Sequence, residues 1–402
     1  MNSYSQHPLR FSLPACLFAA ALSLLGCSNE WTNADDGDGS TDDDVTTDGG
    51  DSGDDDAAAA DSGEGGNDED GGNGDAVSTD EGDAATDDAG TVVPVARCET
   101  SGFEWQSRPR AYIVCTPDPL PAGSLPVVLA FHGGSGNAAQ WRTRTEWDRH
   151  GAANGYATVF LQGCKPALTD CAEPDGSYEW NDGKPGRDSE IDDQGFVLAV
   201  LERLATVHGL VVDAGRVFAT GHSLGGIFTY SLACDHPGLL RAIGPISAPP
   251  SDGTCTPAAG TSIHHVHGTA DDNVPFDTGC CSAAQKNPRD GEYLPGCDEL
   301  PVCYNPNNWW PPVRTGLHPF TNVTGLDAMA TVGLGCGTYG EENHRDGTTV
   351  CRRYAGCPAG AAADVCLVDG VDHKLADLLD AFDIRGWLWQ RFSEDAASPA
   401  EP

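Results

Sequence analysis

Basic residues are scarce in this chain of 402 residues. It contains 22 lysines and arginines against 61 aspartates and glutamates, which gives a formal net charge of −39 at pH 7. Residues 28–96 hold 23 of the acidic residues and no basic one, and residues 97–402 still carry a net charge of −17. Proteins that bind nucleic acid present a basic patch to the phosphates, and no such stripe is visible, so we expect no nucleic-acid partner.

Residues 28–96 are also poor in large apolar side chains and consist almost entirely of Asp, Gly, Ala, Ser and Thr. Such a stretch buries too little apolar surface to offset the entropy that is lost on ordering. We therefore predict an acidic disordered linker over 28–96 and one folded domain over 97–402. The aspartate runs lack the DxDxDG spacing and the distal glutamate of a calcium loop, so no calcium site is predicted there.

The apolar run FSLPACLFAAALSLL near the N-terminus is short for a membrane span. It follows Arg10 and leads into Leu24-Leu25-Gly26-Cys27, which resembles a bacterial lipobox. We predict that residues 1–27 are a lipoprotein-type signal peptide and that acylated Cys27 anchors the exported protein to a membrane. An ordinary secretory peptide is the alternative. We thus expect a cell-surface or outer-membrane lipoprotein, or a secreted protein, with no other membrane contact.

Zinc-binding spacing is missing even though the chain has 16 cysteines, because most of them are scattered singly rather than clustered as CxxC. Fourteen follow the leader, from Cys98 to Cys366. In an exported protein this even number predicts up to seven disulfides. The sequence does not determine their pairing, although the pairs Cys164–Cys171 and Cys336–Cys357 are plausible.

The histidine run of IHHVHG does not predict a metal site either. Successive side chains of a strand point to opposite faces, so only His265 and His267 share a face, and His264 lies on the other. No neighbouring cluster of Cys or Asp completes a ligand set there, and we predict no metal.

The folded part contains apolar strands that alternate with helical segments. Alternation predicts a strand over 110–117, and continuous apolar runs predict strands over 125–131, 156–162, 216–220, 239–248 and 261–268. Helices are expected in the segment up to residue 154, over 195–207, after residue 223, and as one amphipathic helix over 375–392. This order predicts an α/β fold with a mainly parallel sheet covered by helices on both faces, and with ligands at the C-terminal strand ends.

One glycine-rich turn stands where such a fold places a nucleophile. The stretch VFATGHSLGGIF puts Ser223 between an apolar strand and an apolar helix, as in a nucleophile elbow. Glycines at 221, 225 and 226 fit a strained turn in which side chains would collide with the strand and the helix. Ser223 is therefore the candidate nucleophile.

A serine nucleophile needs a base and an orienting acid, which follow it in this order in such sheets. Asp271 stands just past the strand of IHHVHG, with Asp272 as the rival acid, and His373 follows the short apolar stretch VCLVDG. We predict Ser223, Asp271 and His373 as the catalytic residues. The backbone N–H groups of Leu224 and of Gly134, in the loop HGGSG, are the predicted oxyanion donors.

His132, the first residue of that loop, is a further candidate. We expect it to brace the loop rather than to take part in the chemistry.

Four separated segments resemble a known family: RAYIVCTPDPLPAGSLPVVLAFHGGSG, IDDQGFVLAVLERLA, RVFATGHSLGGIFTYSLACDHPGLLRAIGPISA and HHVHGTADDNVPF. They are similar, in this order, to the secreted esterases grouped with polyhydroxybutyrate depolymerases and bacterial feruloyl esterases. The resemblance covers the chain from about Arg110 to the last helix. It implies an α/β-hydrolase fold, ester hydrolysis without a cofactor or metal, and catalysis by Ser223, Asp271 and His373.

The chain departs from the family pattern at two places. Residues around the base run DGVDHKLAD instead of a GGGH-x-W-P type segment. A Cys-rich insertion of about 280–330, between acid and base, is expected to lie over the site as a cap. Its Trp309 and Trp310 are candidates for stacking on an aromatic acyl group or a sugar, or else for packing the insertion itself.

These observations predict an exported, lipid-anchored serine esterase that acts on feruloyl or related carbohydrate esters. Its partner would be an ester substrate, either linked to a polysaccharide or polymeric. Two alternatives remain open. One is a polyhydroxyalkanoate depolymerase with the same catalytic residues, and the other is a non-catalytic binding protein on a hydrolase scaffold.

Overall fold

The computed structural model describes residues 85–86, 92–181, 190–250, 260–271, 273–274, 276 and 325–397. All of these residues belong to one compact unit. The predicted signal peptide with Cys27 lies outside them, as do the rival acid Asp272, the two tryptophans Trp309 and Trp310, most of the predicted linker, and the insertion apart from 325–330. Among the described residues, no helix has the length and apolar character needed to cross a lipid bilayer.

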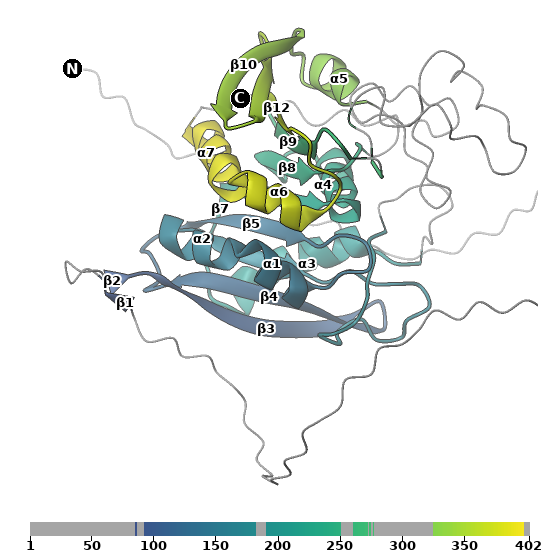
Figure 1. Ribbon diagram of the computed structural model, residues 1–402. Helices are drawn as coiled ribbons and strands as arrows, with labels where there is room; N and C mark the ends of the chain where they lie inside the picture. Colours follow the sequence, from purple (N-terminus) through teal and green to yellow (C-terminus); the bar gives the residue numbers. More distant parts are fainter. Residues whose placement is uncertain are drawn as a thin grey trace, which may run out of the picture. The chain divides into compact units, whose positions relative to one another are not determined.

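A ten-stranded sheet forms the centre of the structure (Figure 1). Its order is β10-β11-β12-β9-β8-β7-β5-β6-β4-β3. The six central strands from β12 to β6 are parallel, whereas β10, β11, β4 and β3 pair in an antiparallel manner at the two sides. The strands are β3 (Val95–Trp105), β4 (Arg108–Asp118), β5 (Leu125–Phe131), β6 (Ala157–Leu161), β7 (Val212–His222), β8 (Ala242–Ile246), β9 (Ser262–Gly268), β10 (Tyr339–Asp346), β11 (Thr349–Tyr354) and β12 (Ala363–Val368). A separate short pair joins β1 (Ala85–Thr86) to β2 (Val92–Val93).

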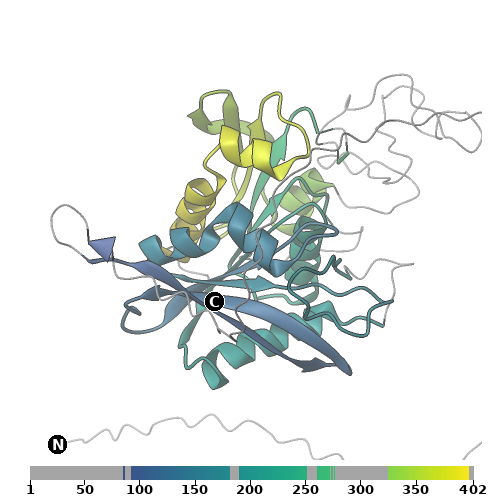
Figure 2. The same cartoon turned by 60° about the horizontal axis from the view of Figure 1, so that its bottom comes forward.

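Helices cover both faces of this sheet, as Figures 1 and 2 show. Apolar side chains of α3 and α4 form one core with one face of the strands, and those of α1, α2, α6 and α7 form a second core with the other face. The helices are α1 (Ala138–Thr145), α2 (Trp147–Asn154), α3 (Asp193–Thr206), α4 (Leu224–Asp235), α5 (Leu326–Ala328) with the π-helix η1 (Met329–Gly333), α6 (Leu375–Ala381) and α7 (Ile384–Ala397). The predicted mainly parallel sheet between two helical layers is confirmed, and the strand–turn–helix at Ser223 completes the predicted α/β-hydrolase fold.

The continuous apolar runs were interpreted correctly, because β5, β6, β8 and β9 are buried along their whole length. The strand predicted over 110–117 is present as β4, but its predicted alternation of buried and exposed side chains is wrong. In β4 every residue over 110–115 is buried. The reason is that β4 lies inside the sheet, between β3 and β6, so that α3 covers one of its faces and α1 and α2 cover the other.

The single C-terminal helix predicted over 375–392 is also wrong, since the chain forms α6 and α7 with a break between them. Phe382 is extended, with φ −150° and ψ 134°. Asp383 then accepts a hydrogen bond from the backbone N–H of Gly386 at 3.1 Å, which caps the start of α7. A local capping residue therefore divided one amphipathic pattern into two helices.

Four disulfides join described residues, and two of them are the predicted pairs Cys164–Cys171 and Cys336–Cys357. The other two link neighbouring strands of the sheet. Cys98–Cys115 joins β3 to β4, and Cys351–Cys366 joins β11 to β12. The bonds thus tie both antiparallel sides of the sheet to its interior.

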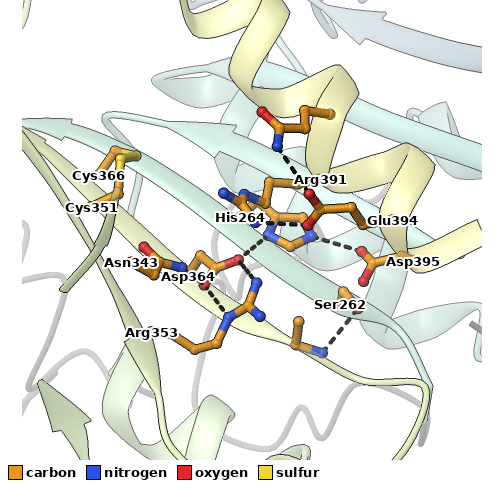
Figure 3. Close-up of polar contacts among 12 residues, drawn as sticks. Ser262, His264, Asn343, Cys351, Arg353, Asp364, Cys366, Arg391, Glu394 and Asp395 are labelled. Atoms are coloured by element: carbon orange, nitrogen blue, oxygen red, sulfur yellow. Dashed lines mark hydrogen bonds and ion pairs between the residues drawn. A yellow bond between two sulfur atoms is a disulfide. The ribbon is translucent and has the colours of Figure 1, made fainter. Parts of the chain in front are cut away.

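A buried charged network attaches α7 to the sheet (Figure 3). The ring of His264 lies between two carboxylates, with Nδ1 at 3.0 Å from Asp364 and Nε2 at 2.7 Å from Asp395 of α7. Arg353 contacts both oxygens of Asp364 at 2.7 and 2.8 Å. Burial alone would lower the pKa of His264, but the carboxylates of Asp395 and Asp364 outweigh it and raise that pKa to about 9. His264 is therefore a buried imidazolium that holds β9, β12 and α7 together.

Candidate active site

Ser223 occupies the turn between β7 and α4 in a conformation that few residues adopt, with φ 53° and ψ −120°. The glycines around it explain how the turn is possible. A Cβ added at Gly221 would lie 2.5 Å from the backbone of Gly225, and one at Gly225 would lie 2.4 Å from the carbonyl oxygen of His132. A Cβ added at Gly226 would lie 2.5 Å from the nearest neighbouring side chain. The predicted steric role of these three glycines is confirmed.

Three predicted residues come together at this turn. Nε2 of His373 lies 3.0 Å from Oγ of Ser223, and Nδ1 of His373 lies 2.8 Å from Oδ2 of Asp271. The three side chains are far apart in sequence, but each follows the C-terminal end of a strand, β7, β9 or β12. Since neighbouring parallel strands end at one edge of a sheet, their loops meet there. The spacing is that of a nucleophile, a base and an orienting acid.

Asp271 is buried and accepts hydrogen bonds on both of its carboxylate oxygens. Oδ1 accepts from the backbone N–H groups of Asn273 at 3.1 Å and of Val274 at 2.7 Å. Oδ2 faces His373 at 2.8 Å and Nε2 of His267 at 3.2 Å. Burial alone would raise the pKa of Asp271, but hydrogen bonds with His267 and His373 hold it well below its usual range. Asp271 is therefore a carboxylate across the neutral pH range.

A histidine that sequence reasoning missed, His222, supports the backbone of the base. Its Nε2–H donates to the carbonyl oxygen of His373 at 2.8 Å, and the two rings lie 4.8 Å apart between centroids. Burial, reinforced by the charge of His373, lowers the pKa of His222 to about 3. A neutral ring is needed beside His373, because a second positive charge there would oppose protonation of the base. The feature of the sequence that could have identified His222 is its position directly before the nucleophile.

The loop HGGSG packs against the nucleophile turn. Leu224 is the first residue of α4, where N–H groups have no acceptor within the helix. A Cβ added at Gly134 would lie 3.8 Å from the Leu224 side chain. His132 braces this loop as expected, since Nδ1 donates to the Gly133 carbonyl at 2.8 Å and Nε2 accepts from the Gly163 N–H at 3.0 Å. Burial lowers the pKa of His132 to about 4, so the ring is neutral.

A cleft of about 940 Å³ opens over Ser223 and His373. Trp141 and Arg144 of α1 line one part of it, and Leu375 and Leu379 of α6 line another. The segment DGVDHKLAD thus supplies both His373 and the α6 wall. A volume of this size accommodates an aromatic or sugar-sized group, with an apolar lining next to charged side chains.

No metal centre is evident among the described residues. The group at ligand distance there consists of Cys98, Cys115 and Asp148, and both of its cysteines are already joined in a disulfide. His265 and His267 share one face of β9 as predicted, but they contact each other, with Nε2 of His265 at 2.8 Å from Nδ1 of His267.

The chain is related in sequence to esterases, although no family model matches it. It is 29% identical over 210 residues to "Putative esterase NocK" of Nocardia uniformis subsp. tsuyamanensis, which covers 50% of this chain and 57% of that protein. It is 24% identical over 204 residues to the bifunctional acetylxylan esterase/xylanase XynS20E of Neocallimastix patriciarum, which covers 49% and 27% of the two chains. The predicted resemblance to esterases is confirmed, while the match spans only about a quarter to just over half of these relatives.

Among solved structures, an acetyl xylan esterase from Aspergillus awamori superposes with a TM-score of 0.45 at 12% identity. The superposition covers 73% of this chain and 99% of that one.

Proposed function

We propose that this protein is a serine esterase that hydrolyses feruloyl or related carbohydrate esters. The observation that carries the proposal is the hydrogen-bonded series of Ser223, His373 and Asp271 at the floor of a cleft. The sequence relationship to esterases supports it, because the relatives include the acetylxylan esterase described above and a feruloyl esterase B. This feruloyl esterase B comes from Thermothelomyces thermophilus and is 29% identical to the chain over 129 residues. That match covers 32% of this chain and 40% of the feruloyl esterase.

In the first half of the reaction, Oγ of Ser223 attacks the ester carbonyl carbon while Nε2 of His373 takes the hydroxyl proton. Asp271 stabilises the imidazolium that forms and keeps Nδ1 of His373 protonated. The carbonyl oxygen becomes an oxyanion that accepts hydrogen bonds from the N–H groups of Leu224 and Gly134. Collapse of this intermediate breaks the bond to the alcohol, which leaves with the proton from His373.

In the second half, His373 acts as a base again and removes a proton from water. The water oxygen attacks the acyl carbon, and the bond to Ser223 breaks as the imidazolium returns the proton to Oγ. The acid product is released, and the enzyme regains its starting state. The proton transfers between base and nucleophile span 3.0 Å, which is within hydrogen-bond reach.

The substrate class rests on the cleft and on the relatives together. The apolar surface of Trp141, Leu375 and Leu379 suits the ring of an aromatic acyl group, and the wide opening of a 940 Å³ cleft leaves room for an attached sugar. Trp309 and Trp310, outside the described residues, stay candidates for stacking on either group.

Hydrolysis of methyl ferulate, acetylated xylan and 3-hydroxybutyrate oligomers by the purified chain tests the proposal, with Ser223→Ala as the matched blank. We expect ferulate or acetyl release that falls by at least about 10⁴-fold in Ser223→Ala while the protein remains folded. Undiminished hydrolysis in the variant would refute the nucleophile assignment. Preference for the hydroxybutyrate oligomers would replace the substrate class with polyesters.

Export and anchoring belong to the same proposal. The lipobox-like sequence before Cys27 supports cleavage and acylation at that residue, and the acidic residues 28–96 would then separate the catalytic part from the membrane. Mass spectrometry of the mature N-terminus tests it: a diacylglyceryl-modified Cys27 is expected, and an unmodified residue at another cleavage site would contradict it.

A further inference from the structure

A chain of buried side chains extends behind Asp271, away from the cleft. Strand β9 places His265 and His267 on the same face, two residues apart, and both side chains are fully buried. The hydroxyl of Tyr230, on α4, lies 2.9 Å from Nδ1 of His265, and Nε2 of His265 lies 2.8 Å from Nδ1 of His267. Nε2 of His267 then faces Asp271. Asp271 thus contacts imidazole rings on two sides. One is His373, the predicted base, and the other is His267, which was not predicted to be catalytic.

The direction of each hydrogen bond in this chain follows from its ends. At one end, Nε2 of His267 faces two acceptors, the Val274 carbonyl oxygen at 2.6 Å and the Asp271 carboxylate at 3.2 Å, so Nε2 must carry a proton. At the other end, the buried Tyr230 hydroxyl has His265 as its partner among the described residues, and it must donate to Nδ1. Burial raises the pKa of Tyr230 well above its usual value, so the phenol keeps its proton.

The two ends leave one arrangement for the middle. His265 accepts from Tyr230 on Nδ1, and burial lowers the pKa of this ring far below its usual value, so it is neutral with its single proton on Nε2. That N–H donates to Nδ1 of His267, which leaves His267 with its proton on Nε2. Every donor in the series therefore points toward Asp271, and no buried donor or acceptor in it is unsatisfied.

We propose that His267, held in this tautomer by His265 and Tyr230, is a positioning residue whose Nε2–H donates to the Val274 carbonyl and makes a second imidazole contact with the Asp271 carboxylate at 3.2 Å. The proposal rests on the esterase function proposed above. Oδ2 accepts from Nδ1–H of His373 on one side and has the Nε2–H group of His267 at 3.2 Å on the other, while Oδ1 accepts two backbone N–H groups. The carboxylate is thereby kept ionised and fixed in orientation, and His373 is aligned on Ser223.

The same contact bears on the charge that faces His373. The N–H group of His267 beside Oδ2 offsets part of the negative charge that Asp271 offers to the imidazolium, so loss of this contact is expected to change the pH dependence of the reaction. Other ionisable groups near His373 are His222 of β7, Asp372 and Lys374 beside it, and Asp380 of α6. They are unchanged by substitutions in the buried series, so a shift in the pH profile reports on His267.

Three variants of the full chain separate positioning from packing. His267→Leu removes the donor, whereas His267→Gln places an amide N–H near the position of Nε2. Tyr230→Phe removes one oxygen atom at the far end. Tyr156→Phe is its control, because the hydroxyl of the buried Tyr156 likewise lies 2.8 Å from Nδ1 of a histidine, the half-buried His150, outside the cleft lining. The readouts are kcat/KM for an ester as a function of pH and the melting temperature.

In His267→Leu we expect kcat/KM to fall by about 10- to 100-fold and its acidic limb to move upward by about 0.5 to 1 pH unit. His267→Gln should recover most of both, and Tyr230→Phe should show a smaller change in the same direction. Tyr156→Phe should leave the profile in place. An unmoved acidic limb in His267→Leu, whatever the rate, would mean that His267 only fills space, and it would overturn the proposal.

Imidazole ¹H–¹⁵N NMR of the unmodified protein supplies a test that needs no substrate and no variant. A proton on Nε2 and none on Nδ1 is expected for His265 and His267, and the Nδ1 resonance of His265 should shift in Tyr230→Phe because that nitrogen loses its hydrogen-bond donor. A proton on Nδ1 of His267 in the unmodified protein would refute the proposal. If the chain hydrolyses no ester, the proposed function fails, while the NMR spectrum still decides whether this hydrogen-bond series exists.

Discussion

Replacement of Asp271 by asparagine tests the site more sharply than its deletion, because the surroundings dictate how the new amide must lie. Oδ1 of Asp271 accepts from the N–H groups of Asn273 and Val274, so the amide oxygen of the introduced side chain takes that position. Its NH₂ group then stands where Oδ2 was, at 2.8 Å from Nδ1 of His373 and 3.2 Å from Nε2 of His267. Donors face donors on that side.

The conflict at His373 can be relieved only by a proton shift that removes its activity as a base. To accept from the amide, His373 must move its proton from Nδ1 to Nε2, where it points at Oγ of Ser223 and can no longer take the hydroxyl proton. The base is then in the wrong tautomer, and the carboxylate that would stabilise its imidazolium is gone. A loss of about 10⁴-fold in kcat is expected, equivalent to about 5 kcal/mol of transition-state stabilisation.

The assay compares steady-state hydrolysis of an ester by the unmodified chain, Asp271→Asn and Asp272→Asn. The neighbouring Asp272, the rival acid in the sequence, is the matched control and should keep kcat within about twofold. Thermal unfolding confirms that both variants are folded. A loss in kcat smaller than about tenfold in Asp271→Asn would refute the assignment of the acid. So would a loss in Asp272→Asn that is greater than the loss in Asp271→Asn.

Two further predictions concern the stability of the scaffold. Because the folded pKa of His264 is raised to about 9 from 6.5, its pairing with Asp364 and Asp395 contributes about 3 kcal/mol that is complete below pH 6.5 and is lost as the pH rises through 9. Urea unfolding from pH 6 to 10 should show this decline, and a His264→Gln variant that declines equally would contradict it. Leu388 of α7 is fully buried against Gly244 of β8. Leu388→Ala should therefore lower the free energy of unfolding, measured in urea, by about 3 kcal/mol. A loss under about 1 kcal/mol would show that α7 does not depend on this contact.

Prediction from the sequence succeeded for elements whose pattern is decided by burial on both faces. The run at 125–131 is apolar throughout because it lies inside a parallel sheet, and the structure places β5 there. The strands that went unpredicted, β3 and the pair β10–β11, lie at or near the sheet edges. β3 and β10 carry many exposed residues, and β11 mixes buried with half-buried ones. Each pairs through a short turn with a strand next to it in the sequence, β3 with β4 and β10 with β11, but no continuous apolar run marks these strands.

The break between α6 and α7 shows a second limit. The pattern over 375–392 has the apolar periodicity of one helix, but Asp383 caps a new start, and the preceding Phe382 turns into the core. A capping residue and a helix-interior residue of the same type look alike until the backbone around them is known.

The sequence by itself determined the α/β class, the nucleophile turn and the order of Ser223, Asp271 and His373, because glycines, apolar runs and polar residues at strand ends are local features with a direct steric or chemical reason. Only the tertiary structure decided what surrounds those residues. Fully buried histidines at 264, 265 and 267 look alike in one short run. Yet the first is an imidazolium in an ion-pair network with α7, and the other two form a hydrogen-bonded series that leads to the catalytic acid. The difference arises because a strand sends neighbouring side chains to opposite faces, where residues far apart in the sequence set the charge and the tautomer of each ring.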